Sequence, residues 1–276
     1  MRRFSGPVRI YYKKTISEKV FAIELDCPEI AGVARPGNFV QLKLIDDKNS
    51  LWPRPFSIHH AAGNLITITI KKYGKTTALI DRLSKGDAML VTGPLGNSFN
   101  DPPRDAPIYL VAGGVGLPPI HFLCENLLKS GYPAGSIKFY SGARTADELL
   151  GNDEIEALGV DYIVATDDGS LGIKGYITEP VAVDITTYRT KNPGRAPVVY
   201  SCGPMVMMQK LAEVCYGLTC YLSLEQLMPC GWGVCNGCAI KIKSRCNDKT
   251  EDERGFRLAR VCREGPIFAA SEVLWK

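Results

Sequence analysis

Short apolar stretches separated by polar turn residues dominate the first third of the chain. Residues 20–25, 38–44 and 65–70 are β-branched or apolar runs bounded by Gly, Pro, Asn and Asp. Runs of this length between turn residues are typical of strands. Their spacing predicts a small antiparallel β-barrel domain over residues 1–100.

The pattern changes after a Pro-rich segment at residues 100–107, which we interpret as a linker. Apolar stretches typical of buried strands lie at residues 108–112, 137–140, 162–165 and 197–200. Helical stretches are expected at residues 118–130 and 204–216. This alternation predicts βαβ units and a parallel sheet, and hence an α/β nucleotide-binding domain over residues 101–217.

The remainder, residues 218–276, is rich in cysteine and too short to build a large core. We therefore expect a small subdomain held together by coordinated metal. The predicted fold class is α/β plus β, with a β-barrel, a parallel-sheet domain and a metal-binding subdomain. A length of 276 residues fits two or three such units.

The composition argues against disordered, nucleic-acid-binding and membrane-spanning proteins. The hydrophobic fraction is 45% and the charged fraction 22%, close to the average of soluble globular proteins. The 33 basic and 29 acidic residues are spread along the chain, which argues against nucleic-acid binding. No apolar stretch reaches the length of about 18 residues that a membrane helix needs, and the first residues lack the apolar core of a signal peptide. We expect a soluble, cytoplasmic protein.

Ten cysteines in a large chain without a secretion signal favour metal ligation or free thiols over disulfides. Cys230, Cys235 and Cys238 have the spacing C-x4-C-x2-C, and further cysteines follow downstream. This is the ligand spacing of plant-type 2Fe-2S proteins. The glycines between these cysteines let the loop wrap closely around a cluster.

Two other interpretations of these cysteines are a four-cysteine zinc site and unligated thiols. Structural zinc sites usually have two pairs of closely spaced cysteines. Here only Cys235 and Cys238 are separated by two residues. Either Cys246 or Cys262 could supply the fourth ligand. The remaining cysteines are interpreted as small buried hydrophobic residues, with Cys202 as a partial exception: Cys27, Cys124, Cys202, Cys215 and Cys220.

A second group of residues suggests a flavin site. An Arg-Pro-x-Ser tetrapeptide alone is compatible with an ordinary turn, but here a Gly-Lys-Thr-Thr segment precedes a probable helix further along the chain. A flavin dinucleotide needs a cation and several donors around its pyrophosphate, which these segments can supply. The predicted flavin-binding residues are Arg54, Pro55, Phe56, Ser57, Ile70, Lys71, Gly74, Thr76 and Thr77.

Three polar, glycine-containing loops follow predicted strands of the parallel sheet. Each alone is compatible with a simple βα connection, but three on one sheet edge indicate a nucleotide site. Their predicted ligand-binding residues are Gly113, Gly114, Gly116, Thr166, Asp167, Asp168, Gly203 and Pro204.

Taken in order, these segments resemble the ferredoxin-NADP reductase superfamily across essentially the whole chain. The greatest similarity is to the iron-sulfur, FAD-containing electron transfer subunit of the two-subunit dihydroorotate dehydrogenase. The resemblance rests on residues 54–57, 74–77, 113–119, 166–170, 202–204 and 223–238, and on residues 261–268, which are similar to the family's ending Val-Cys-x-Asp-Gly-Pro-Val-Phe. Thr76 departs from this pattern, because the family has glycine there.

The resemblance implies that Cys262 is the fourth cluster ligand beside Cys230, Cys235 and Cys238. The interval from Cys238 to Cys262 is longer than the family pattern, so we expect an extra hairpin or loop that contains Cys246. Cys202 occupies the position of a family cysteine near the nicotinamide. It is a candidate catalytic residue that positions hydride transfer, although a buried thiol at a strand end is an equal alternative.

The resemblance further implies FAD, a 2Fe-2S cluster and NAD as cofactors, and a catalytic partner subunit that holds FMN. The two subunits would form a heterotetramer, two of each, that oxidises dihydroorotate in pyrimidine (UMP) biosynthesis. NAD is expected rather than NADP, because Arg144 is a single basic residue with Asp147 and Glu148 close behind.

Other functions are also compatible with the sequence. The same module could serve a sulfide dehydrogenase, an NADH-dependent ferredoxin-NADP oxidoreductase or a cytoplasmic hydrogenase. A redox-sensing module without turnover and a structural zinc protein belong to other classes. We interpret exposed residues near the cluster loop, including Trp232, as the surface that meets the partner, with a packing role for Trp232 as the alternative.

Overall fold

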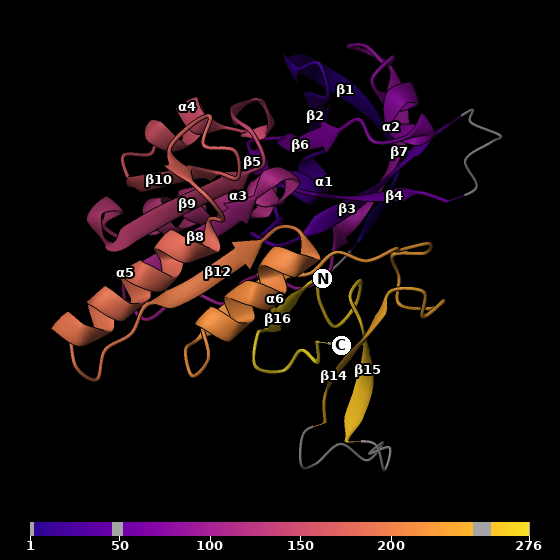
Figure 1. The fold of residues 1–276 in the computed structure, drawn as a ribbon. Coiled ribbons are helices and arrows are strands. Elements are labelled where there is room, and N and C mark those ends of the chain that lie inside the picture. The colour runs from indigo at the N-terminus through magenta and orange to yellow at the C-terminus, as the bar shows by residue number, and fades with distance from the viewer. Residues whose placement is uncertain (1–2, 46–51, 245–254, 276) are drawn as a thin grey trace.

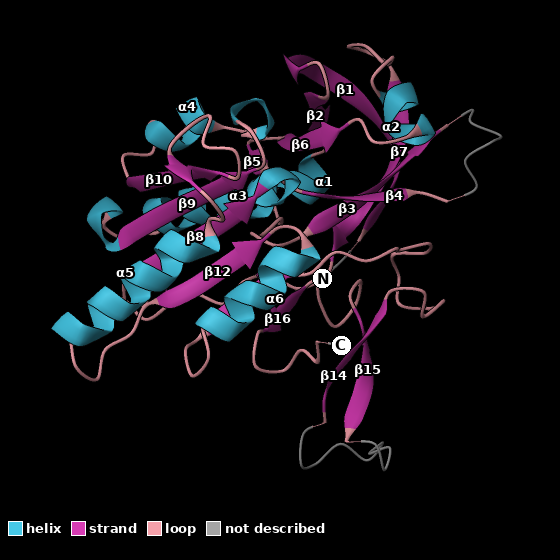
Figure 2. Ribbon diagram, viewed as in Figure 1, coloured by secondary structure: helices cyan, strands magenta, loops and turns pink. Residues whose placement is uncertain are grey.

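A computed structural model describes residues 3–45, 52–244 and 255–275 of the chain. Cys246 therefore lies outside the described residues. Figures 1 and 2 show two large sheets joined by extended chain, with a small hairpin projecting from one side. No helix among the described residues is both long enough and apolar enough to span a membrane.

The N-terminal strands form one curled antiparallel sheet in the order β4-β3-β7-β1-β2-β6-β5. Its elements are β1 (Phe4–Ser17), β2 (Val20–Asp26), α1 (Pro28–Ala31), β3 (Phe39–Leu44), β4 (Arg54–Ser57), β5 (His60–Ala62), β6 (Leu65–Lys71), α2 (Lys75–Ile80) and β7 (Ala88–Leu95). The strands expected at 20–25, 38–44 and 65–70 are all present.

The long strand β1 produces the curl of this sheet. Its first half pairs with β7, and its second half pairs with β2 after an irregularity between Ile10 and Tyr12. A bulge of this kind increases local twist and bends the strand. Because side chains alternate between the faces of a strand, Ile66, Ile68 and Ile70 of β6 all point into the core.

The second sheet has the order β11-β10-β9-β8-β12-β13-β16 and is parallel from β11 to β13. Its strands are β8 (Ile108–Gly113), β9 (Ile137–Ala143), β10 (Asp161–Thr166), β11 (Ile173–Lys174), β12 (Val198–Cys202), β13 (Cys220–Ser223) and the antiparallel β16 (Ile267–Ala269). The predicted parallel sheet is confirmed. Residues 100–107, expected as a linker, contain no helix or strand.

Helices cover both faces of this sheet (Figure 1). One face packs against α3 (Leu117–Lys129) and α4 (Asn152–Glu156), and the other against α5 (Thr178–Lys191) and α6 (Met205–Val214). Short 3-10 turns occupy Gly114–Gly116 (η1), Ala134–Ser136 (η2) and Ala146–Glu148 (η3). Such a layered sheet places the turns after its strands on one edge, where α/β folds bind ligands.

The C-terminal segment is divided between two structures. β13 and β16 extend the parallel sheet, whereas β14 (Ala239–Lys243) and β15 (Phe256–Arg260) form a separate antiparallel pair. This pair lies between Cys238 and Cys262, where the sequence predicts an extra hairpin or loop. The cysteine segment thus shares a core with α5, α6 and the sheet, through Cys238, Ile242 and Val261 among others.

Candidate functional site

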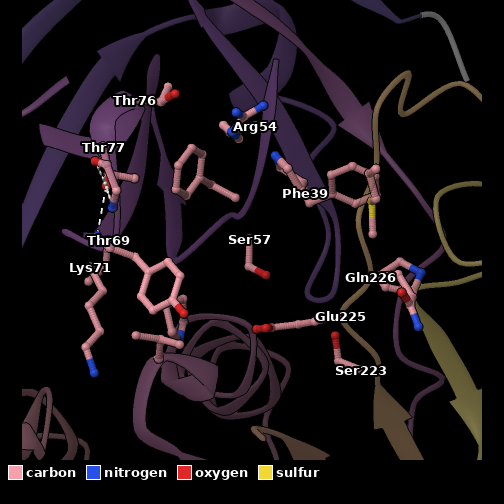
Figure 3. A pocket seen from close by; sticks show the side chains of 18 of the residues that line it. Phe39, Arg54, Ser57, Thr69, Lys71, Thr76, Thr77, Ser223, Glu225 and Gln226 are labelled. Carbon is pink, nitrogen blue, oxygen red and sulfur yellow. Dashed lines mark hydrogen bonds between the residues drawn. The ribbon is translucent and has the colours of Figure 1, made fainter. Parts of the chain in front are cut away.

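A cavity of about 700 Å³ lies between the curled sheet, the start of α3 and the segment that follows β13. Ligand pockets usually enclose about 300–1,000 Å³, so this cavity has room for a nucleotide-sized molecule. Side chains from β3, β4, β6, α2 and the segment after β13 converge on it (Figure 3).

Almost all of the predicted flavin-binding residues line this cavity. They are Arg54, Pro55, Phe56, Ser57, Lys71, Gly74, Thr76 and Thr77. Ile70 does not, because it is fully buried in the core of the sheet. Its neighbours on the opposite face of β6, Thr69 and Lys71, line the cavity instead. The period-two alternation of β6 was the signal that could have separated Ile70 from Thr69.

The start of α2 is organised by one hydroxyl group. Thr77 Oγ1 accepts hydrogen bonds from the backbone N–H groups of Tyr73 and Gly74, at 2.9 Å and 3.1 Å, and donates to the Gly74 carbonyl at 3.0 Å. Thr77 therefore fixes the turn, while Thr76 presents its side chain to the cavity (Figure 3). Thr76 lies inside the helix with no positive φ, so a side chain is tolerated where the family has glycine.

The last residue of β13 and the residues after it form the wall opposite Arg54. Ser223, Glu225 and Gln226 line the cavity, and the Glu225 side chain extends into the space below Ser57 (Figure 3). Sequence reasoning treated residues 223–225 only as the start of the cluster motif. The structure shows that these three residues also line the cavity, because β13 pairs with β12 and ends beside it.

The turns after β8 and β12 touch each other at the edge of the parallel sheet. A Cβ atom placed on Gly116 would lie 2.2 Å from the Cys202 carbonyl oxygen, and one on Gly203 would lie 3.1 Å from Gly113 Cα. Glycines are needed here because the two turns approach so closely. Val115 of this turn and Pro118 at the start of α3 line the cavity, which places the nucleotide loop against the flavin site.

Two predicted nucleotide residues have clear local roles. Thr166 is fully buried, and its hydroxyl donates to the Leu171 carbonyl at 2.8 Å and accepts from the Leu171 N–H at 3.0 Å. Asp168 is exposed and accepts hydrogen bonds from the hydroxyl and N–H of Ser170, which lower the pKa of its carboxyl. Asp167 is also exposed, so the solvent-facing carboxylates of this loop are available to a ligand, whereas Thr166 shapes the turn.

Cys202 ends β12 and is 2% exposed. Burial raises the pKa of its thiol, which is therefore neutral at pH 7. It does not line the 700 Å³ cavity, although Ser223 on the neighbouring strand does. Its role in positioning hydride transfer stays a prediction.

The structure brings Cys262 beside the loop that carries Cys230, Cys235 and Cys238. Cys238 and Cys262 are buried with their Sγ atoms 3.3 Å apart, and the Cys262 N–H donates to Cys238 Sγ. Cys230 Sγ accepts from the Trp232 N–H and Cys235 Sγ from the Gly237 N–H, both at 3.4 Å. The other described cysteines form no disulfide and are buried, as predicted for hydrophobic packing: Cys27, Cys124, Cys202, Cys215 and Cys220.

The backbone of the loop has the conformations that wrapping around a cluster requires. Gly231 and Gly233 have φ of 70° and 77°, and Asn236 is the one described residue other than glycine with a positive φ. Arg260 ties the loop down, because its Nη1 donates to the Gly233 carbonyl at 2.7 Å while its guanidinium pairs with Glu264. These contacts hold the three-cysteine loop against the segment that carries Cys262.

The donor set fits a metal-sulfur group. Burial acts to raise the pKa of Cys230, but N–H groups of Cys235, Trp232 and Val234 lower it to about 6. Cys230 is therefore mainly a thiolate at neutral pH, the form that binds metal, whereas burial raises the pKa of Cys262 to about 12, so this thiol must lose its proton when metal binds. Four cysteines with backbone N–H groups directed at sulfur fit a 2Fe-2S cluster, and the C-x4-C-x2-C spacing favours it over zinc.

Comparisons with known proteins agree with this site. A family model described as the iron-sulfur cluster binding domain of dihydroorotate dehydrogenase B matches residues 225–274. A second model, described as an oxidoreductase NAD-binding domain, matches residues 110–213. Among solved structures, one reported for an NADH-dependent reduced ferredoxin-NADP oxidoreductase has a TM-score of 0.78 and 27% identity, covering 97% of this chain and 90% of that chain.

A ferredoxin NADP+ reductase from Neisseria gonorrhoeae shares the fold, with a TM-score of 0.64 and 17% identity over 82% of this chain and 95% of that chain. The curated relatives are named electron transfer subunits of dihydroorotate dehydrogenase B (NAD(+)). The protein from Clostridium acetobutylicum is 33% identical over 87% of this chain and 86% of its own length. That from Geobacillus kaustophilus is 33% identical over 95% of both chains. The chain therefore belongs to the family of dihydroorotate dehydrogenase B electron transfer subunits, within the ferredoxin-NADP reductase superfamily.

Proposed function

We propose that this chain carries electrons between the FMN of a catalytic partner subunit and NAD, through a 2Fe-2S cluster and FAD, in dihydroorotate oxidation for UMP biosynthesis. One observation carries the proposal: the wall of the 700 Å³ cavity continues directly into the cysteine loop. Met228 lines the cavity and Cys230 follows two residues later. A flavin exchanges hydride with nicotinamide and single electrons with an iron-sulfur cluster, so a site between the two is where it is needed.

The chain's own residues would hold the flavin in place. Arg54 supplies a fixed positive charge at the rim of the cavity, and Ser57 and Thr76 supply hydroxyl groups. Phe39 and Phe56 give flat apolar surface for an aromatic ring system. Gln41 Nε2 of β3 donates to the Met228 carbonyl at 3.0 Å. This hydrogen bond holds the chain segment that leads from the cavity to the cysteine loop against β3.

The region after β9 supports NAD over NADP. Arg144, directly after β9, is the basic residue of this segment that could meet a 2′-phosphate, but its Nη2 lies 2.6 Å and its Nε 3.2 Å from the Glu148 carboxylate. A guanidinium already paired with a carboxylate is a poor partner for a second anion, because the carboxylate repels phosphate. We expect the complex to oxidise NADH much faster than NADPH.

The fourth cluster ligand is proposed to be Cys262, with Cys230, Cys235 and Cys238 as the other three. Its Sγ lies beside Cys238 Sγ, and the loop bonds described above hold both cysteines. The domain bounds 1–100, 101–217 and 218–276, a cytoplasmic location, and a heterotetramer of two subunits of each kind are part of the same proposal.

The best-supported alternative is the equivalent subunit of an NADH-dependent ferredoxin-NADP oxidoreductase. The TM-score of 0.78 with a structure of that name favours it over a sulfide dehydrogenase or a hydrogenase. The sequence relationship to dihydroorotate dehydrogenase B subunits is stronger, at 33% identity against 27%. The catalytic partner decides between these functions.

The test is co-expression with candidate partner subunits and anaerobic purification of the complex. We expect dihydroorotate-dependent reduction of NAD, with FAD, FMN and two irons per pair of subunits. A loaded complex that reduces ferredoxin or oxidises sulfide, and does not oxidise dihydroorotate, would overturn the dihydroorotate assignment. A chain that binds neither flavin nor iron would overturn the electron-transfer function itself.

A further inference from the structure

The chain contains three histidines, and all of them line one cavity that the proposed electron path does not use. This second cavity, of about 460 Å³, lies between β5, β6, α3 and α4. His59 and His60 come from the curled sheet, His121 from α3, and Glu154 from α4. Side chains of the curled sheet thus meet side chains of two helices that cover the parallel sheet.

His59 has one ring nitrogen occupied and one without a partner. The side chain is buried, 6% exposed, and its Nδ1 lies 2.6 Å from Thr69 Oγ1. With its proton on Nδ1, the ring donates to the Thr69 hydroxyl and presents a lone pair at Nε2. Within the described part of the chain Nε2 accepts no hydrogen bond, and it lies 3.6 Å from the Glu154 carboxylate.

His121 presents a second such nitrogen. It is also 6% exposed, and its Nδ1 has no hydrogen-bond partner among the residues that the structure describes. The rings of His59 and His121 are perpendicular, with centroids 4.7 Å apart. One nitrogen of each ring and one Glu154 oxygen lie within 4.8 Å of one another.

Two buried ring nitrogens without hydrogen-bond partners destabilise the folded chain, because each has lost its contact with water and gained no replacement. A metal ion removes this destabilisation, since neutral imidazole is a common ligand of transition metals. Burial lowers the pKa of His59 to about 3 and also lowers the pKa of His121, so both rings are neutral at pH 7. The Thr69 hydroxyl supplies the outer hydrogen bond that orients ligating histidines.

We propose that His59 Nε2, His121 Nδ1 and the Glu154 carboxylate bind one divalent transition-metal ion of the Zn²⁺ type. Two imidazoles and one carboxylate form a three-ligand set that Zn²⁺ accepts, with a fourth position left to water from the cavity. The ion would connect the segment between β4 and β5 to α3 and α4. It would act as a clip between the curled sheet and the parallel-sheet domain.

The test uses the purified chain with its flavin and iron in place, so that the cluster cysteines are occupied. Adventitious metal is removed with a chelator, the iron content is checked, and ZnCl₂ is titrated by calorimetry. We expect one Zn²⁺ per chain. Glu154→Gln should weaken binding at least tenfold and His121→Asn further, whereas Glu156→Gln, an exposed position on the same helix, should bind like wild type.

Zinc-edge X-ray absorption identifies the ligands independently of these variants. Imidazole nitrogen and carboxylate oxygen without sulfur would support the site. Sulfur ligands, no uptake of Zn²⁺ by the wild type, or equal binding by Glu154→Gln and Glu156→Gln would each overturn it. Glu154 is a half-exposed side chain, so Glu154→Gln should fold and the comparison does not depend on His121→Asn.

Discussion

Arg54 is the residue on which flavin retention should depend most. It supplies positive charge at the rim of the 700 Å³ cavity, and its Nη1 donates to the Trp52 carbonyl at 3.0 Å. A charge-assisted hydrogen bond contributes about 1.5–3 kcal/mol, so Arg54→Ala should weaken FAD binding by about ten- to a hundredfold. The ratio of flavin to protein after dialysis measures this loss.

Arg9→Ala is the matched control for Arg54→Ala. Arg9 is an exposed arginine of the same sheet, and its Nη1 also donates to a backbone carbonyl, that of Gly86 at 2.9 Å. It lies outside the cavity, so this variant should keep its flavin. Equal flavin loss from both variants would mean that Arg54 acts only through the stability of the sheet.

The fourth cluster ligand can be identified by a pair of cysteine variants. Cys262→Ser should abolish the visible absorption of the cluster and lower the iron content severalfold, because a buried thiolate is replaced by a poor ligand. Cys246→Ser should leave both unchanged. Iron analysis and the electron paramagnetic resonance of the reduced cluster report the outcome, and the reverse result would move the ligand to Cys246.

At the scale of elements, the turn between β8 and α3 should not tolerate larger side chains, because it contacts the end of β12. Gly116→Ala would place a methyl carbon 2.2 Å from the Cys202 carbonyl oxygen. Overpacking of this kind costs about 1–3 kcal/mol, and here it would also move the loop that faces the flavin cavity. We expect lower stability in denaturant titrations and slower NADH oxidation with an artificial acceptor.

Gly135→Ala provides the control for this turn. Gly135 lies in η2 on the same domain, and an added methyl group there would meet no atom within 4 Å. Its stability should change little. If Gly116→Ala is as stable and active as Gly135→Ala, the close approach of the two turns is not needed for function.

Element positions were largely predictable from local pattern. Seven strands and two helices begin and end within a few residues of the predicted ranges. They are β2, β3, β6, β8, β9, β10, β12, α3 and α6. Apolar alternation and flanking turn residues determine such elements locally. Ile70 was predicted as a flavin-binding residue, but the alternation of β6 turns its side chain into the core.

At the scale of the whole molecule, the two buried histidines between the sheets should make stability depend on pH. The folded pKa of His59 is about 3, because burial disfavours its charged form, whereas an unfolded histidine has a pKa of about 6.5. Below pH 6.5 the unfolded chain binds a proton that the folded chain does not. Stability is therefore complete above pH 6.5 and falls as the pH drops toward 3.

The loss expected from His59 between pH 7 and pH 5 is about 2 kcal/mol. Denaturant titrations in the presence of a chelator, at both pH values, should show a smaller loss for His59→Gln than for the wild type. Comparison with the variant removes contributions shared by both proteins, including those of the cysteine loop. An equal loss in the two proteins would contradict the assignment to His59.

The sequence by itself determined the features that depend on local pattern and spacing. Apolar periodicity predicted the two sheet types, and C-x4-C-x2-C predicted the cluster loop. These features could be predicted because residues that are close in the sequence form each strand and supply three of the four cluster ligands.

Only the tertiary structure decided which distant segments meet. It placed β13 and β16 in the parallel sheet, so that Glu225 lines the same cavity as Ser57. It also brought His59, His121 and Glu154 together, although 62 and 33 residues separate them along the chain. Contacts of this kind depend on strand order and on packing between sheets, which no local pattern encodes.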